Sequence, residues 1–282
     1  MFRIKSRVIV GLTTYYNENL IISLSGLKRL KQCATLIIHN DNPDTKVTKR
    51  QIRRMGYRGK LHIINCAYNN GPLGSRLAII EFVKKHKIKA DWFMFADDDD
   101  IVLNLDVPKI ENNHFAIIQN MAVIRTRLID VLRIIKDANN FTIDNENIYL
   151  VRPHMGMAGT LVRKDDILRL GTILGQARQE ISDVDEGLNF RPPVDMLMWS
   201  ALNIIARHDN DKTTPIYMDT LNYIATDIDT APMKYGMQIQ PQKNPQQQIL
   251  SAIAKYDTVV RAALGAATDK NAAPAGQITD TE

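Results

Sequence analysis

Four short apolar runs, each followed by a polar loop, constrain the fold of this chain of 282 residues more than any other feature. The runs cover residues 8–12, 35–38, 61–64 and 92–96, and their lengths are typical of buried β-strands. Between them the sequence predicts helices at 20–30, 46–55 and 71–85, the last with Gly71 as N-cap and Pro72 in its first turn. This alternation predicts an α/β fold with a mostly parallel sheet flanked by helices.

The polar loops of this region follow the predicted strands at 13–18, 40–44, 69–71 and 97–100. Because parallel strands end at the same edge of a sheet, we expect these four loops to converge. In open α/β sheets, ligands bind in the crevice outside the carboxyl ends of the strands. The sequence therefore predicts a ligand site at this edge.

The last of these loops consists of four consecutive aspartates, residues 97–100. Neighbouring carboxylates repel one another, which raises their pKa values unless a cation compensates. A hard divalent ion such as Mg²⁺ or Mn²⁺, together with the phosphates of a ligand, supplies that compensation. A solvated acidic turn that caps a following helix is the alternative interpretation.

Size and composition indicate an ordinary globular protein with one large domain or one domain with appendages, since 45% of the residues are hydrophobic and 24% are charged. No apolar run approaches the roughly 18 residues of a membrane span. The basic start is followed by an apolar run too short for a signal peptide. Cys33 and Cys66 lack metal-ligand spacing and are typical of free thiols in a reducing compartment. We therefore expect a cytoplasmic location.

The net charge of +5 is unevenly distributed. Residues 46–60 contain seven basic residues and no acidic one, and Lys84, Lys85, Lys87 and Lys89 form a second cluster. Such clusters can follow a phosphate backbone or an anionic membrane surface. A solvated helix face is the simpler interpretation, and both remain open.

The second half of the chain is less regular. We expect strands at 115–121 and 148–151, a helix at 125–137, and a glycine-interrupted strand at 156–162 where a ligand or backbone can approach closely. Helices are predicted at 194–206 and at 244–264, the latter opened by Pro245. Residues 265–282 are rich in small and polar residues and are expected to be disordered.

The first hundred residues resemble the GT-A glycosyltransferases, in particular the family-2-like enzymes that use nucleotide sugars. Four stretches carry the resemblance in order. They are Tyr16-Asn17-Glu18 after the first strand, Asp41 within residues 40–44, residues 69–76 with Asn69, Gly71 and Arg76, and the aspartates 97–100. The proline usual before the first stretch is absent, and Leu77 replaces an asparagine that often follows the arginine.

The resemblance implies a donor site and a metal site. The donor would be a nucleoside-diphosphate sugar, preferably a UDP-sugar, and the cofactor Mn²⁺ or Mg²⁺. Asp97 and Asp99 would bind the ion, and His208 is a further candidate metal ligand. The expected donor-binding residues are Thr13, Tyr16, Asn17, Glu18, Asp41, Arg76, Asp97 and Asp98. For Arg76, a place on an exposed helix face is the alternative.

An inverting transfer also needs a general base for the acceptor hydroxyl. The family supplies a carboxylate at the start of a later helix, and Asp195 is the best match, with Asp185 and Glu186 in reserve. A helix cap is the alternative role for Asp195. His154 and His208 are the histidines considered as ligands, and an ordinary structural role is the alternative for both.

These inferences predict a GT-A (Rossmann-like) α/β fold. Residues 1–110 would form the nucleotide-sugar-binding half and 111–235 the acceptor-binding half of one domain, followed by a helical appendage at 236–264 and a tail at 265–282. The expected activity is metal-dependent transfer of a sugar to an acceptor hydroxyl, with inversion. The alternatives are a glycosyltransferase acting on a modified base in DNA, through the basic segment 46–60, and a non-catalytic module that binds nucleic acid or a membrane surface. A sugar nucleotidyltransferase is disfavoured because no glycine-rich loop follows the first strand.

Overall fold

The computed structural model describes residues 7–111, 114–124, 148–151, 156–186, 194–208, 214–226 and 245–271. The helix expected at 125–137 and the candidate ligand His154 lie outside these ranges.

The first half of the chain forms the parallel part of the sheet. Its strands are β1 (Val8–Thr14), β2 (Cys33–Asn40), β3 (Leu61–Asn65) and β4 (Trp92–Asp97), in the spatial order β3-β2-β1-β4. All four predicted strands are present, each longer than predicted. Thr13 pairs with His39 on one side and with Asp97 on the other, so these strands end side by side.

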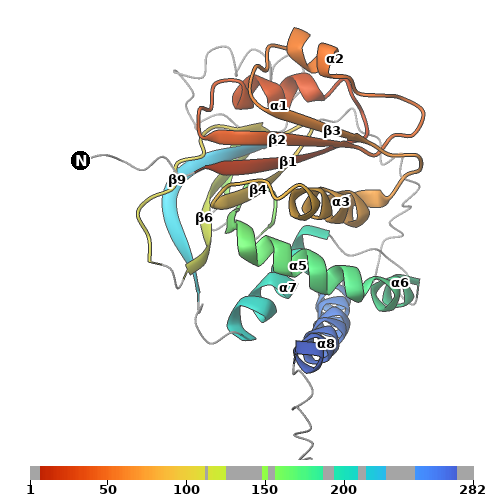
Figure 1. The fold of residues 1–282 in the computed structure, drawn as a ribbon. Coiled ribbons are helices and arrows are strands. Elements are labelled where there is room, and N and C mark those ends of the chain that lie inside the picture. The colour runs from red at the N-terminus through yellow and green to blue at the C-terminus, as the bar shows by residue number, and fades with distance from the viewer. Residues whose placement is uncertain are drawn as a thin grey trace, which may run out of the picture.

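Alternating side chains of these strands enter two separate cores. Val8, Val10 and Leu12 point to the face covered by α1 (Leu20–Leu27) and α2 (Lys49–Arg54). Ile9 points to the opposite face, which α3 (Gly71–Lys85) covers. Figure 1 shows this layering, with α1 and α2 on one side of the sheet and α3 on the other. A parallel sheet buried on both faces accounts for the continuous apolar runs.

The chain after β4 extends the same sheet. The order continues through β8 (Leu161–Arg163), β6 (His114–Ile124), β9 (Thr214–Thr226) and β5 (Ile101–Val102), and β7 (Ile148–Val151) pairs with β6. Here β8 is antiparallel to both β4 and β6, whereas β9 is parallel to β6. The predicted α/β class is confirmed, with a sheet that is parallel in its first half and mixed in its second.

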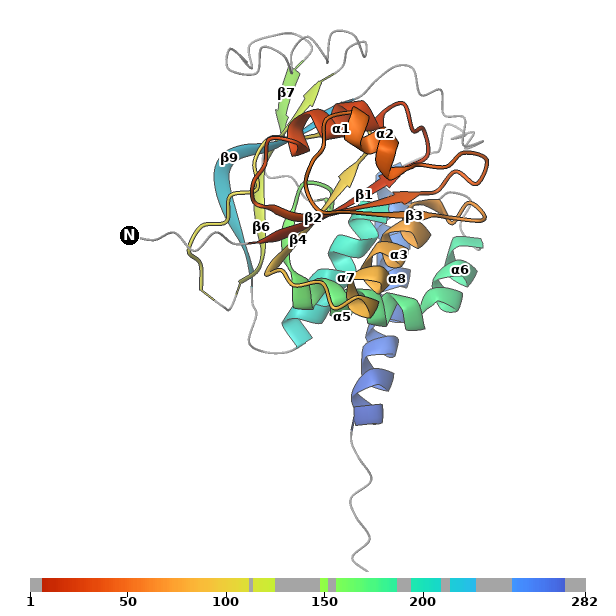
Figure 2. The same ribbon diagram turned by 45° about the horizontal axis from the view of Figure 1, so that its top comes forward.

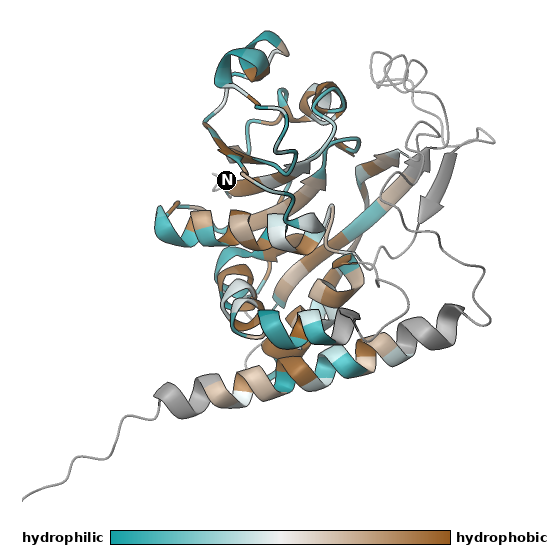
Figure 3. Ribbon diagram, turned by 90° about the vertical axis from the view of Figure 1, so that its right-hand side faces the viewer, coloured by the Kyte–Doolittle hydropathy of each residue, from teal (hydrophilic) through white to brown (hydrophobic). Residues whose placement is uncertain are grey.

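Four further helices of the described chain lie on the α3 side of the sheet: α5 (Lys164–Gln176), α6 (Arg178–Glu186), α7 (Val194–His208) and α8 (Pro245–Asn271), and α8 packs on the other three. In Figure 2 they lie together with α3 on one side of the sheet. In Figure 3, α8 is the long helix at the bottom of the view. Its buried residues Ala252, Tyr256, Val260 and Leu264 recur every four residues along one stripe. The disorder expected from residue 265 is wrong as far as Asn271, because the helix continues to that residue.

Three other expectations differ from the structure. The strand expected at 156–162 is shorter, because only Leu161–Arg163 forms a ladder and Ala158 makes an isolated bridge to Phe95. Gly71 is the first residue of α3 rather than its cap, which is Asn70. The elements α5, α6, β5 and β9 were not predicted. In the described part of the chain, no helix is long and apolar enough to cross a membrane.

Candidate active site

The carboxyl edge of the parallel strands brings the predicted loops together, as expected. The Asp41 N–H donates to the carbonyl of Thr14 at 2.8 Å, so the loop after β2 lies against the end of β1. The Thr13 hydroxyl donates to Asp97 Oδ1 at 3.1 Å, which joins the ends of β1 and β4. Three loops far apart in sequence therefore meet at one place.

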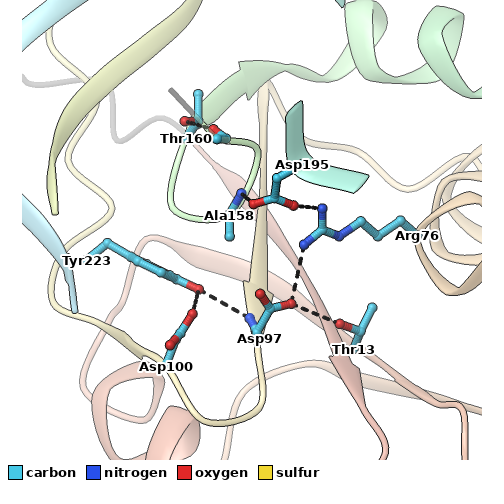
Figure 4. A network of polar contacts seen from close by, with 9 residues as sticks. Thr13, Arg76, Asp97, Asp100, Ala158, Thr160, Asp195 and Tyr223 are labelled. Carbon is cyan, nitrogen blue, oxygen red and sulfur yellow. Dashed lines mark hydrogen bonds and ion pairs between the residues drawn. The ribbon is translucent and has the colours of Figure 1, made fainter. Parts of the chain in front are cut away.

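Arg76 reaches in between Asp97 and Asp195 at this edge (Figure 4). Its side chain comes from the first turns of α3, is only 5% exposed, and lies 5.3 Å from the centre of the Phe95 ring. The guanidinium is within 3.4 Å of Asp97 Oδ1 and forms an ion pair with Asp195. The alternative of an exposed surface arginine is therefore wrong for Arg76.

Asp195 connects three parts of the chain. It lies in the first turn of α7, where the helix dipole favours a carboxylate. Its Oδ1 pairs with Arg76, and its Oδ2 accepts the Ala158 N–H at 3.2 Å. Both oxygens are thus engaged, but a carboxylate has about four lone-pair positions, so capacity remains for a hydroxyl donor.

The second and fourth aspartates make their bonds within the protein. Asp98 Oδ2 accepts the Thr14 hydroxyl at 2.6 Å. Asp100 is 7% exposed and accepts the Tyr223 hydroxyl at 2.6 Å and the Thr226 N–H at 3.0 Å. These bonds hold the loop after β4 against β1 on one side and β9 on the other.

Burial and mutual repulsion perturb these carboxyl groups. Burial first and the charge of Asp99 next raise the pKa of Asp98 to about 8, although the bond from Thr14 lowers it. The pKa of Asp100 lies well above its ordinary value, again through burial first and the charges of Asp99 and Asp97 next. The aspartate loop therefore carries more negative charge than the hydrogen-bond donors around it compensate.

A divalent cation fits this set of oxygens. The repulsion among the aspartates is what a cation would relieve, and Asp97 and Asp99 are partly exposed. Within the described residues, no group of three or more His, Cys, Asp or Glu side chains is arranged to hold a metal ion. An ion here would thus take few protein ligands, as Mg²⁺ does where one or two carboxylates and substrate phosphates bind it.

The loops on the other side of β1 are also joined by hydrogen bonds. Asp41 is 7% exposed, and its Oδ1 accepts the backbone N–H of Asn70 at 2.8 Å. Asn17 donates to Thr45 at 2.8 Å, which links the loop after β1 to the loop after β2. Gly71 follows at a φ of 69°, which only glycine adopts readily, so the chain can turn directly into α3.

The remaining donor candidates line the same loop. The ring of Tyr16 packs edge-on against that of Tyr15, with centroids 5.2 Å apart, and is partly buried. Glu18 is exposed. The expected donor residues therefore lie on neighbouring loops of one edge.

The structure does not bring every candidate to this edge. His208 is the last residue of α7 and is exposed, about 20 Å along the helix from Asp195 at its start. Asp185 and Glu186 end α6, and their side chains lie outside the described part of the chain.

Sequence reasoning missed the support that β9 gives to the site. The Tyr223 hydroxyl accepts the Asp97 N–H at 3.2 Å while it donates to Asp100. Asn222 donates to the carbonyl of Gly159 at 3.0 Å, and the Gly159 N–H donates to the carbonyl of Phe95 at 2.9 Å. Thr220, Tyr223, Ile224 and Thr226 are residue types with strand propensity and were the available signal.

No protein-family model matches the chain, and no curated protein matches its sequence. Among solved structures, the chain is similar to a mannosyltransferase from Pyrobaculum calidifontis in complex with GDP-Man and Mn²⁺, at 12% identity over 94% of this chain and 75% of that chain, with a TM-score of 0.44. It is similar to S. aureus TarS in complex with UDP-GlcNAc, at 14% identity over 92% and 71%, with a TM-score of 0.45. It is also similar to a 4-diphosphocytidyl-2C-methyl-D-erythritol synthase from Anaerococcus prevotii, at 12% identity over 89% and 96%, with a TM-score of 0.36.

Proposed function

We propose that this protein is a glycosyltransferase that moves a sugar from a nucleoside-diphosphate sugar to an acceptor hydroxyl. One observation carries the proposal: hydrogen bonds hold the four stretches that resemble the GT-A enzymes, or residues directly beside them, together at a single sheet edge. Asp41 bonds to Asn70, Thr13 and Arg76 contact Asp97, and Asn17 bonds to Thr45 beside the loop of Asp41. A fold alone would not require these contacts.

We assign the donor to the loops after β1, β2 and β4. Thr13, Tyr16, Asn17, Glu18 and Asp41 would surround the nucleoside. Arg76 lies near the N-terminus of α3, where its charge and the helix dipole both favour the diphosphate. Asp98 contributes by its bond to Thr14, which fixes the position of the loop. UDP is the proposed nucleotide.

The proposed activity depends on Mn²⁺ or Mg²⁺ held by Asp97 and Asp99. When bound, such an ion neutralises the diphosphate and stabilises the negative charge that develops on the leaving group. The chain itself prepares this place by fixing the loop: Tyr223 bonds to Asp97 and Asp100, and Thr226 bonds to Asp100. We do not include His208, because it lies at the far end of α7.

Asp195 is the proposed general base. Arg76 and the Ala158 N–H hold its carboxylate in one orientation beside Asp97, and its remaining lone pairs can accept the acceptor hydroxyl. Transfer with one base and no protein nucleophile inverts the anomeric centre, so inversion is the proposed outcome.

The acceptor is proposed from charge. The segment 46–60 begins at the donor edge, because the Val47 N–H donates to Asn65 Oδ1 at the end of β3, at 2.9 Å. Lys46 and Lys49 are exposed beside it, so an anionic acceptor such as a modified base in nucleic acid is the alternative to a small hydroxyl acceptor.

Both cysteines are free thiols, and we propose a cytoplasmic location on that basis.

Release of nucleoside diphosphate from a panel of nucleotide sugars, with and without Mn²⁺, tests this function. We expect release from one donor, dependent on Mn²⁺ and lost in Asp99→Asn. The matched control is Asp165→Asn, since the Asp165 side chain is 86% exposed on α5 and far along the chain from the aspartate loop. Release that is the same in Asp99→Asn and in the wild type would contradict the proposal, as would no release from any donor.

A further inference from the structure

The edge of the sheet opposite the candidate active site is strongly basic. In a parallel sheet the connecting helices run back, so their C-termini lie at the amino ends of the strands. Here each of three connections ends in a segment rich in lysine and arginine, at residues 28–31, 54–60 and 84–89. We call these three segments together the basic edge. Its basic residues are Lys28, Arg29, Lys31, Arg54, Arg58, Lys60 and the four lysines of 84–89, and all are exposed.

Three contacts show that these segments lie close together around the start of β1. The Val8 N–H donates to the carbonyl of Gln32 at 3.1 Å, just after the first segment. A side chain at Gly56 would lie 3.6 Å from Lys28 Cδ, which places the second segment beside the first. The N–H of Asp91 donates to the carbonyl of Arg7 at 3.0 Å, just after the third segment.

The basic edge has no acidic residue of its own. The segments 28–31, 54–60 and 84–89 contain neither Asp nor Glu. In the described part of the chain, none of their cations forms an ion pair with a carboxylate. Nearby, Asp91 accepts the Arg7 N–H at 3.2 Å and Asp106 accepts the Gln32 side chain at 2.8 Å. The positive charge of the edge is therefore largely uncompensated, and it faces solvent.

The chemistry of the edge fits phosphates rather than lipid tails or stacked bases. The exposed large apolar residues of the described chain are Ile21, Tyr68, Met196 and Tyr217, and none lies in the three segments. A membrane-surface helix combines cations with inserted apolar side chains. Single-stranded nucleic acid is held by stacking on aromatic rings. Repeated cations without apolar or aromatic neighbours fit the regularly spaced phosphates of a duplex.

We propose that the basic edge binds duplex nucleic acid through its backbone phosphates, without reading its sequence. The edge and the aspartates lie at opposite ends of β1, a strand of 7 residues, and so are about 20 Å apart. A duplex bound there leaves the donor site open. The inference therefore does not depend on the proposed glycosyl transfer, and either can fail without the other.

Fluorescence anisotropy of the full chain with a labelled duplex of about 20 base pairs, between about 50 and 200 mM salt, tests the proposal. If about six phosphates are contacted, the logarithm of the affinity falls with the logarithm of the salt concentration with a slope of about −5. The variants are Lys28→Glu/Lys31→Glu and Lys85→Glu/Lys89→Glu. The control is Lys255→Glu/Arg261→Glu on α8, which changes the net charge equally at exposed positions.

We expect each edge variant to weaken binding at least tenfold and to make the slope shallower by about 2, while the control has a much smaller effect. Thermal unfolding of each variant checks that it is folded. Three results would overturn the proposal: no binding at the lowest salt, an equal loss in the α8 control, or tighter binding to single strands or to vesicles with anionic lipid than to the duplex.

Discussion

Arg76→Met is the substitution that tests the architecture of the site most severely. The methionine keeps an unbranched apolar stem over Phe95 but removes the guanidinium. Asp97 then loses a partner at 3.4 Å, and Asp195 loses the partner of its Oδ1. Two carboxylates that one buried cation held together would then repel each other.

The magnitude follows from burial. Removing one partner of a fully buried ion pair costs about 3–5 kcal/mol. The carboxylates here are 38% and 26% exposed, so water compensates part of the loss, and we expect a decrease of about 2–3 kcal/mol in the free energy of unfolding. For a domain of this size that corresponds to a fall of roughly 5–10 °C in Tm.

A double-mutant cycle measured by urea unfolding checks this reasoning. Arg76→Met and Asp195→Asn each break the same ion pair, so the double variant should be less destabilised than the sum, with a coupling energy of about 1–3 kcal/mol. Arg54→Met, at an exposed arginine of α2, is the control and should stay within about 0.5 kcal/mol of the wild type. Additive effects of the two substitutions would refute the proposed role of Arg76.

Three further predictions concern neighbouring groups. Tyr223→Phe leaves Asp100 without its phenol donor and should lower the free energy of unfolding by about 1–3 kcal/mol, as measured by thermal unfolding. Tyr217→Phe, at an exposed tyrosine of the same strand, is the control and should have no such effect. Equal effects of the two substitutions would count against the role of β9. In metal-free protein, the pKa of about 8 for Asp98 lies above the ordinary 3.8, so between these values the folded state keeps a proton that the unfolded chain has lost. The free energy of unfolding should therefore fall as pH rises through this window, by at most about 1.4 kcal/mol per pH unit. Denaturant unfolding of Asp98→Asn at several pH values should show a weaker dependence of this free energy on pH. An unchanged dependence in the variant would disprove the assignment to Asp98. Burial raises the pKa of Cys33 to about 11, so a thiol reagent at pH 8 should label Cys66 first. Mass spectrometry of the labelled Cys33→Ser and Cys66→Ser variants measures the two rates. Faster labelling of Cys33 would contradict its burial.

The first half of the fold could be predicted because its signals are local. Each parallel strand is buried on both faces and reads as a continuous apolar run, and each is followed by a loop rich in turn residues. The convergence of Thr13, Asp41 and Asp97 then follows from strand direction alone. The predicted strands were too short by one to four residues, because polar residues such as Asn40 and Asp97 continue the ladder at the site edge.

The second half could not be predicted in the same way because its pairing is non-local. β9 lies beside β6 although about 100 residues separate their starts, and no nearby turn fixes its register. The partners of Asp100 therefore remained unknown, although the aspartate itself was evident. His208 shows the opposite case: its residue type suggested a ligand, whereas the length of α7 places it far from Asp195.

The ion pair of Arg76 with Asp195 was also beyond the sequence. Each residue was selected for a separate role, one near the diphosphate and one as the base. Their contact across 119 positions depends on how α3 and α7 approach β4. Only the structure indicates that Arg76, proposed for the donor side, and Asp195, the proposed base, are in direct contact.

The most direct test of the central claim is the thermal stability of the protein with UDP, GDP, CDP and ADP, each with and without Mn²⁺. A ligand at about 100 times its Kd raises the free energy of unfolding by about 2.7 kcal/mol. We predict stabilisation by one of these nucleotides, dependent on Mn²⁺, absent in Asp99→Asn and retained in Asp165→Asn. No stabilisation by any nucleotide, or stabilisation that persists without Mn²⁺ and in Asp99→Asn, would contradict a metal-dependent donor site at the aspartate loop.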